Sequence, residues 1–364
     1  MMNIPFNDLL RGFKLFKAEY EAKAIEVLNS GRYIMGTEVT TFEEVFAKKN
    51  CVNFCVGVDN GLNAIALGLN SLGIGIGDEV IVQSNSYIAT VLAITHNKAT
   101  PIFVEPDSCF NMDYKKIEEK ITSKTKAILV THLYGQATRM DEILEIANKY
   151  KLYLLEDCAQ AHFAEYKSQA VGTFGQLGFF SFYPTKNMGA FGDGGAIITN
   201  NIELNEKLRV LRNYGSGRKY YNEMVGYNSR LDELQAGLLN VKLKHVKGLI
   251  GRRREVAKRY LEGIQNNKIV LPNIQKEATH TWHLFVIRTK NRNEFRDYLA
   301  KNSIGSDVHY PIPPHLSQAY KDSGYLKGDY PIAEEYAETV VSLPLFDGMR
   351  DEEVEKVINT INKW

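Results

Sequence analysis

One lysine, Lys186, lies in a setting that suits covalent chemistry on a carbonyl compound. It falls in a turn between two apolar runs, 177–182 and 196–199, which read as buried strands. Pro184 ends the first run, and four glycines lead into the second, namely Gly189, Gly192, Gly194 and Gly195. A lysine in apolar, rigid surroundings has a lowered pKa, so its amine can act as a nucleophile. A lone lysine in a surface turn is usually solvated, so the functional interpretation of Lys186 depends on the residues that accompany it elsewhere in the chain.

Two polar residues, Asp157 and Gln160, follow another apolar run, 152–156. An aspartate at the end of a buried strand is costly unless it is paired, which makes Asp157 a candidate for a functional role. Beside a pyridine ring, its carboxylate would keep the ring nitrogen protonated. Gln160 lies one turn later and could hydrogen-bond an oxygen on the same ring.

Two further features lie where expected strands lead into helices. The sequence Asp59-Asn-Gly-Leu62 begins a helix whose free backbone N–H groups favour a phosphate, although Asn-Gly is also an ordinary turn. Tyr87 begins the next helix and could either stack on a planar ring or pack in the core. A phosphate cradle, a stacking aromatic ring, a pyridinium partner and a Schiff-base lysine together describe a pyridoxal 5′-phosphate site.

These residues need a scaffold that gathers strand ends, and the first half of the chain predicts one. Short apolar runs alternate there with helical runs, giving strands at 54–58, 79–83, 101–104, 127–133 and 152–156 and helices at 62–72, 87–96, 114–120 and 140–150. This alternation predicts an α/β fold with a mostly parallel sheet covered by helices on both faces. Ligands bind such sheets at the carboxyl ends of the strands, where the candidate residues fall.

A long amphipathic helical region, 230–264, predicts a bridge between two domains. We expect residues 1–245 to form a large domain with an N-terminal arm, and residues 246–364 to form a smaller α+β domain. The large domain would also contain helices at 16–28, 41–49 and 202–213. The small domain would contain a strand at 283–288 and helices at 293–302 and 351–364.

Composition narrows the classes of function. The chain has 364 residues, 44% hydrophobic and 24% charged, with a net charge of +1, which gives no reason to expect nucleic acid or a membrane as a partner. No signal peptide is evident in 1–20, and the four cysteines lack metal-binding spacing, so we expect a reduced, cytoplasmic protein without a bound metal. Four histidines were weighed as metal ligands, but no carboxylate spacing supports them: His280, His283, His309 and His315. The basic residues of 230–264 read as a solvated helix face rather than a nucleic-acid stripe.

Four motifs resemble those of the DegT/DnrJ/StrS nucleotide-sugar aminotransferases: Glu156-Asp-Cys-Ala-Gln-Ala-His162, Ser181-Phe-Tyr-Pro-Thr-Lys-Asn-Met-Gly-Ala190, Gly192-Asp-Gly-Gly-Ala196 and Gly226-Tyr-Asn-Ser-Arg-Leu-Asp-Glu-Leu-Gln-Ala236. The resemblance runs through essentially the whole chain. It implies an aspartate-aminotransferase-like (fold type I) structure that binds pyridoxal 5′-phosphate and forms a homodimer. Two residues depart from the family pattern, because Phe163 stands where a glycine is usual and Gln176 where an aspartate is common.

The resemblance also implies roles for individual residues. Lys186 would be the Schiff-base lysine, Asp157 the partner of the pyridine nitrogen and Gln160 the partner of the ring hydroxyl. The phosphate ligands would be Ser181, the backbone of Gly61 and Leu62, and Asn228 from the other subunit. The expected substrate ligands are His309, Tyr310 and His315, with Arg218, Lys219 and Arg230 as candidates for the diphosphate.

The implied reaction is a ping-pong transamination, in which L-glutamate leaves as 2-oxoglutarate and its nitrogen passes to a ketosugar carried on a nucleotide. Four segments resemble the subgroup that aminates C3 of a dTDP-3-keto-6-deoxyhexose: Asn60-Gly-Leu-Asn63, Ser86-Tyr-Ile-Ala-Thr90, Trp282-His-Leu-Phe-Val-Ile-Arg288 and Tyr310-Pro-Ile-Pro-Pro-His-Leu316. The resemblance implies that the aminated sugar is used for surface glycans such as lipopolysaccharide. Amination at C4 of a nucleotide-linked 4-keto-6-deoxyhexose is the alternative.

Three other classes of protein fit the sequence less well. A sugar dehydratase of the same family has a histidine in place of the lysine, so Lys186 argues against it. A nicotinamide oxidoreductase would carry Gly-x-Gly-x-x-Gly after the first strand, and this chain does not. A regulatory protein without turnover is disfavoured because every catalytic position is filled.

Overall fold

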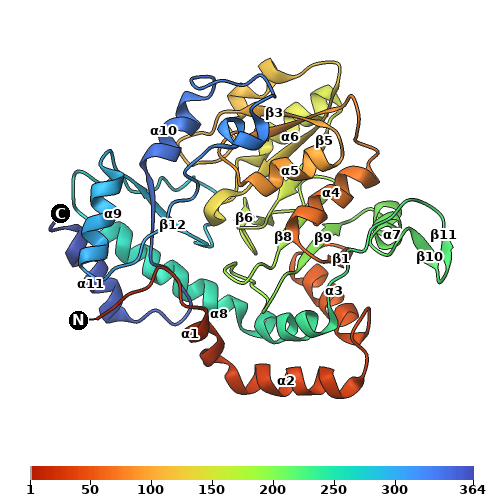
Figure 1. The fold of residues 1–364 in the computed structure, drawn as a ribbon, viewed down its shortest axis with the longest axis horizontal. Helices are drawn as coiled ribbons and strands as arrows, with labels where there is room; N and C mark the ends of the chain where they lie inside the picture. Colours follow the sequence, from red (N-terminus) through yellow and green to blue (C-terminus); the bar gives the residue numbers. More distant parts are fainter. Residues whose placement is uncertain (1) are drawn as a thin grey trace.

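The computed structural model describes residues 2–364, and its centre is a seven-stranded sheet (Figure 1). In spatial order the strands are β1 (Phe54–Val58), β9 (Gly195–Thr199), β8 (Leu177–Ser181), β5 (Tyr153–Asp157), β4 (Thr125–Thr131), β2 (Glu79–Gln83) and β3 (Thr100–Val104). β9 pairs antiparallel with β1 and β8, and the other neighbouring pairs are parallel. The mostly parallel sheet expected from the sequence is therefore confirmed.

Helices cover both faces of the sheet because the strand side chains alternate between two cores. In β4, Ile128 and Val130 are fully buried in one core, while Ala127 and Leu129 are fully buried in the other. The first core is covered by α3 (Thr37–Lys49), α6 (Met140–Tyr150) and part of α8 (Glu233–Gly263), and the second by α4 (Gly61–Ser71), α5 (Ile88–His96) and α7 (Ile202–Leu211). A strand buried on both sides reads as a continuous apolar run, as the sequence of β4 does.

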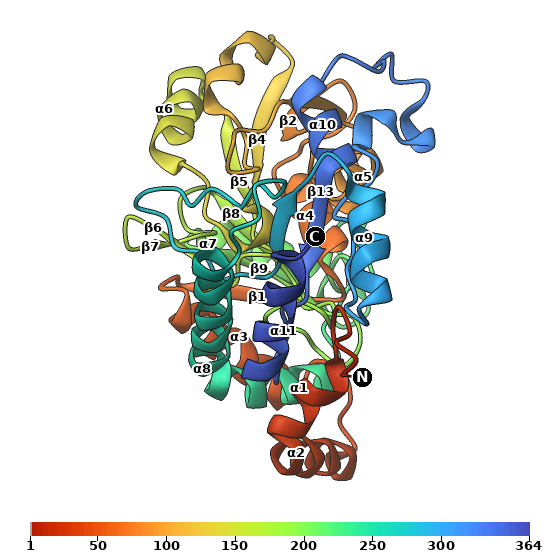
Figure 2. The ribbon, with the colours of Figure 1, turned by 90° about the vertical axis from the view of Figure 1, so that its left-hand side faces the viewer.

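The long helix α8 runs from beneath the sheet to the C-terminal part of the chain (Figures 1 and 2). That part contains the antiparallel pair β12 (Phe285–Arg288) and β13 (Val340–Leu343) with α9 (Arg292–Lys301), α10 (Pro331–Thr339) and α11 (Asp351–Ile361). Its core includes Val256 of α8 and Ile4 from the N-terminal arm. The smaller α+β region expected at the C-terminus is confirmed, and the predicted boundary at residue 245 falls inside α8.

One side chain of α8, Arg253, ties this helix to the C-terminal region. Its Nε donates a hydrogen bond to Oδ1 of Asp347 at 2.9 Å. Its Nη1 donates to the carbonyls of Trp282 at 3.2 Å, His283 at 3.4 Å and Leu345 at 3.2 Å. The buried guanidinium thus fixes the segment that leads into β12.

The helix expected at 16–28 is confirmed as α2 (Lys17–Ser30), which ends at the left-handed Gly31. A further helix, α1 (Leu9–Leu15), precedes it in the expected N-terminal arm. Phe16 separates the two helices, and its ring stacks on His245 of α8 at 3.8 Å. One expected helix differs in the structure. The segment 114–120 forms two 3₁₀ turns, η1 (Tyr114–Lys116) and η2 (Glu118–Lys120). Ile117 is the one fully buried residue of that segment, so no apolar stripe holds an α-helix against the protein.

The remaining elements were not expected from the sequence and are short or late in the chain. They are η3 (Leu133–Gly135), β6 (Glu165–Tyr166), β7 (Gln169–Ala170), β10 (Ser216–Arg218), β11 (Tyr221–Asn222), η4 (Pro314–Leu316), η5 (Gln318–Tyr320), α10 and β13. Across residues 2–364, no helix combines the length and the apolar character needed to cross a membrane.

Candidate active site

A cavity of about 530 Å³ opens at the carboxyl ends of β4, β5 and β8. Thr131 ends β4 and pairs with Asp157, which ends β5, so the two side chains start from neighbouring positions. All seven residues expected to hold the cofactor from the same subunit line this cavity: Gly61, Leu62, Tyr87, Asp157, Gln160, Ser181 and Lys186. His309 and Tyr310 of the C-terminal region line it as well.

Lys186 sits in a tight turn that follows β8. Its backbone N–H donates to the carbonyl of Tyr183 at 2.8 Å, and the N–H of Gly189 donates to the carbonyl of Lys186 at 2.7 Å. A Cβ at Gly189 would lie 2.1 Å from the carbonyl oxygen of Pro184, so the turn requires glycine there. Burial lowers the pKa of Lys186 to about 8, while the neighbouring Asp157 carboxylate opposes this change. Roughly one-tenth of its amine is therefore unprotonated at pH 7.

Asp157 is 4% exposed and meets the cavity with both carboxyl oxygens engaged. Oγ1 of Thr90 donates to Oδ2 at 2.7 Å, and the N–H of Ala159 donates to Oδ1 at 3.0 Å. Burial raises the pKa of Asp157. The two hydrogen bonds and the charge on Lys186 lower this pKa, but by less than burial raises it. A carboxyl group buried in this way gains most from a cation in direct contact.

The start of α4 forms the opposite end of the cavity. Asn60 caps the helix by accepting the N–H of Asn63 on its Oδ1 at 2.8 Å, which leaves the N–H groups of Gly61 and Leu62 at the free end. A Cβ at Gly61 would lie only 2.6 Å from Cβ of Ser181, so glycine keeps this corner open. Free N–H groups, the helix dipole and the Ser181 hydroxyl form a binding site for a phosphate.

A polar and aromatic wall links Gln160 to the C-terminal region. Nε2 of Gln160 donates to the hydroxyl of Tyr310 at 3.0 Å, and its Oε1 accepts the N–H of Tyr134 at 2.8 Å. The Tyr134 hydroxyl donates to the carbonyl of His309, and the rings of Tyr87 and Tyr310 lie 4.9 Å apart. These contacts hold the 309–310 loop over the cavity.

The other expected substrate and phosphate ligands lie outside the cavity of this chain. His315 is 1% exposed, with its Nε2 3.1 Å from Oε1 of Glu334, and its ring packs against Phe103 and Tyr330. The remaining four residues lie on or beside the β10–β11 hairpin: Arg218, Lys219, Asn228 and Arg230. The charged groups of Arg218 and Lys219 lie over neighbouring tyrosine rings, and Arg230 donates a hydrogen bond to Asn213. The structure therefore does not bring these five residues to the cavity of their own subunit.

The residues that line the cavity and were missed by sequence reasoning include Thr90, Thr131 and His283. Thr90 lies one helical turn after Tyr87, so helical spacing could have found it. Thr131 ends β4, and the same rule about strand ends that selected Asp157 could have selected it. His283 lies in a segment that resembles the C3-aminating subgroup, but the sequence analysis considered it individually only as a metal ligand.

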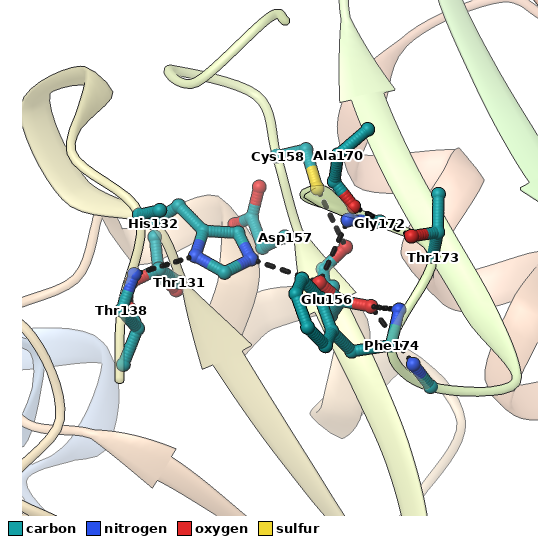
Figure 3. Close-up of polar contacts among 12 residues, drawn as sticks. Thr131, His132, Thr138, Glu156, Asp157, Cys158, Ala170, Gly172, Thr173 and Phe174 are labelled. Carbon is teal, nitrogen blue, oxygen red and sulfur yellow. Dashed lines mark hydrogen bonds and ion pairs between the residues drawn. The ribbon is translucent and has the colours of Figure 1, made fainter. Parts of the chain in front are cut away.

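Beneath the cavity, His132 and Glu156 form a fully buried network (Figure 3). Oε2 of Glu156 accepts the N–H of Gly172 at 2.7 Å, and Oε1 accepts those of Phe174 at 2.7 Å and Gly175 at 2.9 Å. Nδ1 of His132 accepts the N–H of Thr138 at 3.0 Å, so its Nε2 carries the proton and donates to Oε2 of Glu156 at 3.1 Å.

This network fastens the loop 172–175 to the end of β5, one residue before Asp157. The Sγ of Cys158, which lies close to both groups, donates to the Glu156 carbonyl at 3.7 Å. Because the carboxyl oxygens and the imidazole nitrogens are engaged with protein donors and acceptors, the cluster serves as a structural support.

The cavity residues fit pyridoxal 5′-phosphate. Asp157 lacks a directly bonded cation among the described residues and would receive one from the protonated pyridine nitrogen. The corner between Gly61 and Ser181 would accept the phosphate, and the amine of Lys186 would reach the aldehyde carbon.

The fold and this site define a fold type I pyridoxal-phosphate enzyme. Comparison with known proteins narrows the class. The chain belongs to the DegT/DnrJ/EryC1/StrS aminotransferase family, which it matches over residues 15–362.

Its relatives match along nearly the whole chain. The dTDP-3-amino-3,6-dideoxy-alpha-D-galactopyranose transaminase of Aneurinibacillus thermoaerophilus is 51% identical and covers 99% of each chain. The dTDP-3-amino-3,4,6-trideoxy-alpha-D-glucose transaminase of Streptomyces venezuelae is 43% identical and covers 99% of this chain and 96% of the relative. The crystal structure of S. venezuelae DesV in complex with a ketimine intermediate has a TM-score of 0.98 and 43% identity, covering 100% of this chain and 99% of that one. The family resemblance stated from the motifs is confirmed.

Proposed function

We propose that this aminotransferase uses pyridoxal 5′-phosphate to transfer the amino group of L-glutamate to C3 of a dTDP-3-keto-6-deoxyhexose. The observation that carries the chemistry is the placement of Lys186, Asp157 and the start of α4 around one cavity. The choice of C3 is supported by the 51% identity with an enzyme named for a 3-amino-3,6-dideoxy sugar. The products are 2-oxoglutarate and a dTDP-3-amino-3,6-dideoxyhexose, and a surface glycan stays the predicted destination of that sugar.

The bound cofactor supplies a carbonyl group that carries the nitrogen and an aromatic ring that takes up electrons from the neighbouring carbon. Lys186 acts as the proton carrier, because an amine with a pKa of about 8 can both accept and return a proton near neutral pH. Asp157 would hold the ring nitrogen in its protonated form through a charge-assisted hydrogen bond. Gly61, Leu62 and Ser181 would hold the phosphate and so keep the ring near Lys186.

Residues 309–310 and Tyr87 supply the wall that the substrate meets. Tyr310 is held by Gln160, and burial raises the pKa of its hydroxyl, so it stays a neutral hydrogen-bonding group. Burial lowers the pKa of His309 to about 4, and its Nδ1 lies 2.8 Å from Oγ of Ser342. Neutral donors and acceptors of this kind suit the hydroxyl groups of a hexose.

We further propose a homodimer in which the β10–β11 hairpin of one subunit completes the cavity of the other. Two apolar side chains on or just after this hairpin are strongly exposed, Tyr220 at 85% and Val225 at 91%, as expected of a surface that meets a partner. The hairpin carries Arg218 and Lys219 for the diphosphate, and Asn228 for the cofactor phosphate follows it. A monomer by sedimentation at working concentration that is still active would refute this proposal.

The experiment that tests the regiochemistry offers the purified enzyme the 3-keto and 4-keto dTDP-6-deoxyhexoses side by side, with L-glutamate. We expect faster amination of the 3-keto sugar, with the position of the new amine read by NMR. Faster amination of the 4-keto sugar would overturn the C3 assignment and favour the alternative reaction. Failure of glutamate to bleach the yellow protein would overturn the choice of amino donor.

A further inference from the structure

His283 lies in the cavity wall beside Lys186, and its imidazole has no hydrogen-bond partner within residues 2–364. Its Nδ1 is buried and unpaired, and no hydrogen bond joins its Nε2 to the described part of the chain. The residue as a whole is only 6% exposed. Buried polar groups are nearly always hydrogen-bonded, so an open imidazole in a ligand cavity indicates that the ligand supplies the partner.

The backbone around His283 is held on three sides. Arg253 donates to its carbonyl, and the N–H of the following residue, Leu284, donates to the carbonyl of Tyr134 at 3.3 Å. Two residues before His283, the carbonyl of Thr281 accepts a hydrogen bond from Nδ2 of Asn187 at 2.8 Å. Asn187 directly follows Lys186. The backbone that carries the imidazole is therefore held by contacts to α8, to η3 and to the Lys186 turn. Such contacts suit a residue that has to meet a ligand with a defined geometry.

The charges around the ring decide which ligand group it can meet. Burial lowers the pKa of His283 well below its ordinary value, and Lys186, Arg253, His309 and His162 act in the same direction. The imidazole is thus neutral and offers one N–H donor and one acceptor nitrogen. A carboxylate is met best by a cation, whereas a neutral imidazole matches a sugar hydroxyl, which also donates and accepts one hydrogen bond.

We propose that Nε2 of His283 hydrogen-bonds a ring hydroxyl of the hexose and so orients the sugar over Lys186. This inference rests on the proposed function, since it needs the sugar in the cavity. The carbon that receives nitrogen has to lie within reach of Lys186, which places its neighbouring hydroxyl groups beside His283. His283 is thereby a residue for sugar recognition that is separate from the nucleotide and from the amino donor.

The test measures binding to the cofactor-loaded enzyme by calorimetry, with a dTDP-6-deoxyhexose that lacks the keto group and with dTDP as the two ligands. His283→Phe keeps the ring volume and removes both nitrogens, while His283→Gln places an amide near the position of Nε2. We expect His283→Phe to weaken the dTDP-sugar about tenfold, the scale of one hydrogen bond, and to leave dTDP within about twofold. His283→Gln should restore most of the loss.

His280→Asn is the matched control, because His280 lies on the same segment, stacks on Trp282 and does not line the cavity. It should leave both affinities unchanged. Equal losses for dTDP and the dTDP-sugar, or no loss in His283→Phe, would overturn the inference. So would a slower glutamate half-reaction with unchanged sugar affinity, followed by bleaching of the cofactor colour. If the wild-type enzyme binds dTDP but gains nothing from the sugar, the proposed function fails instead.

Discussion

The lowered pKa of Lys186 predicts how the rate of covalent cofactor capture depends on pH. With a pKa of about 8, roughly one-tenth of the amine is unprotonated at pH 7. With the ordinary value of 10.5, about one part in three thousand would be unprotonated, so burial makes the reactive form ~300-fold more abundant. Only the unprotonated amine attacks an aldehyde. We expect the capture rate to rise about tenfold per pH unit up to about pH 8 and to level off above it.

The assay mixes cofactor-free protein with pyridoxal 5′-phosphate between pH 6 and pH 10 and follows the yellow colour. Nα-acetyl-lysine in the same buffers is the control for changes in the cofactor itself, and its rate should keep rising past pH 10. Asp157→Asn should move the break to lower pH, because the Asp157 carboxylate raises the pKa of Lys186. A break near 10.5 in the wild-type protein would refute the burial argument, and an unmoved break in Asp157→Asn would refute the pairing.

Three further predictions concern the support of the cofactor. Asp157→Asn should retain the cofactor but lower turnover by more than about tenfold, or 1.4 kcal/mol of barrier, because an amide cannot hold the ring nitrogen protonated; a smaller loss in steady-state kinetics would contradict the role. Gly61→Ala should weaken cofactor binding at least about tenfold by equilibrium dialysis, since the added Cβ would crowd Ser181, whereas Gly251→Ala on α8 meets nothing within 4 Å and should leave binding unchanged. Glu156→Gln should lower the free energy of unfolding in urea by roughly 2 kcal/mol, because the new NH₂ group would face hydrogen-bond donors; an unchanged midpoint would show that the network does not stabilise the fold.

The parts of the site that follow from local sequence were predictable. Strand periodicity placed Asp157 at the end of β5, and the glycines around Lys186 marked its turn. The helix α1 and the contact that Phe16 makes with His245, more than two hundred positions away, were not expected, because no local pattern reports such a contact. The position of His283 likewise depends on hydrogen bonds between segments that are distant in the sequence.

The position of His315 and the β10–β11 hairpin could not be predicted from the sequence for a similar reason. His315 shares a motif with Tyr310, but the chain between them turns away from the cavity, so the pairing of His315 with Glu334 depends on α10. The β10–β11 hairpin has exposed residues on a short pair of strands, and such strands carry little periodic signal. Spacing along the chain identified the chemistry, whereas the orientation of each side chain depended on tertiary contacts.

The residues that line the cavity come from two stretches of the chain, one before α8 and one after it. In the proposed reaction, Gly61, Asp157 and Lys186, which precede α8, would meet the cofactor. His283 and His309, which follow α8, would meet the sugar together with Tyr87. Arg253 joins the two stretches without lining this cavity. Substitutions after α8 would therefore change much of the wall that meets the hexose and leave Asp157 and Lys186 unchanged.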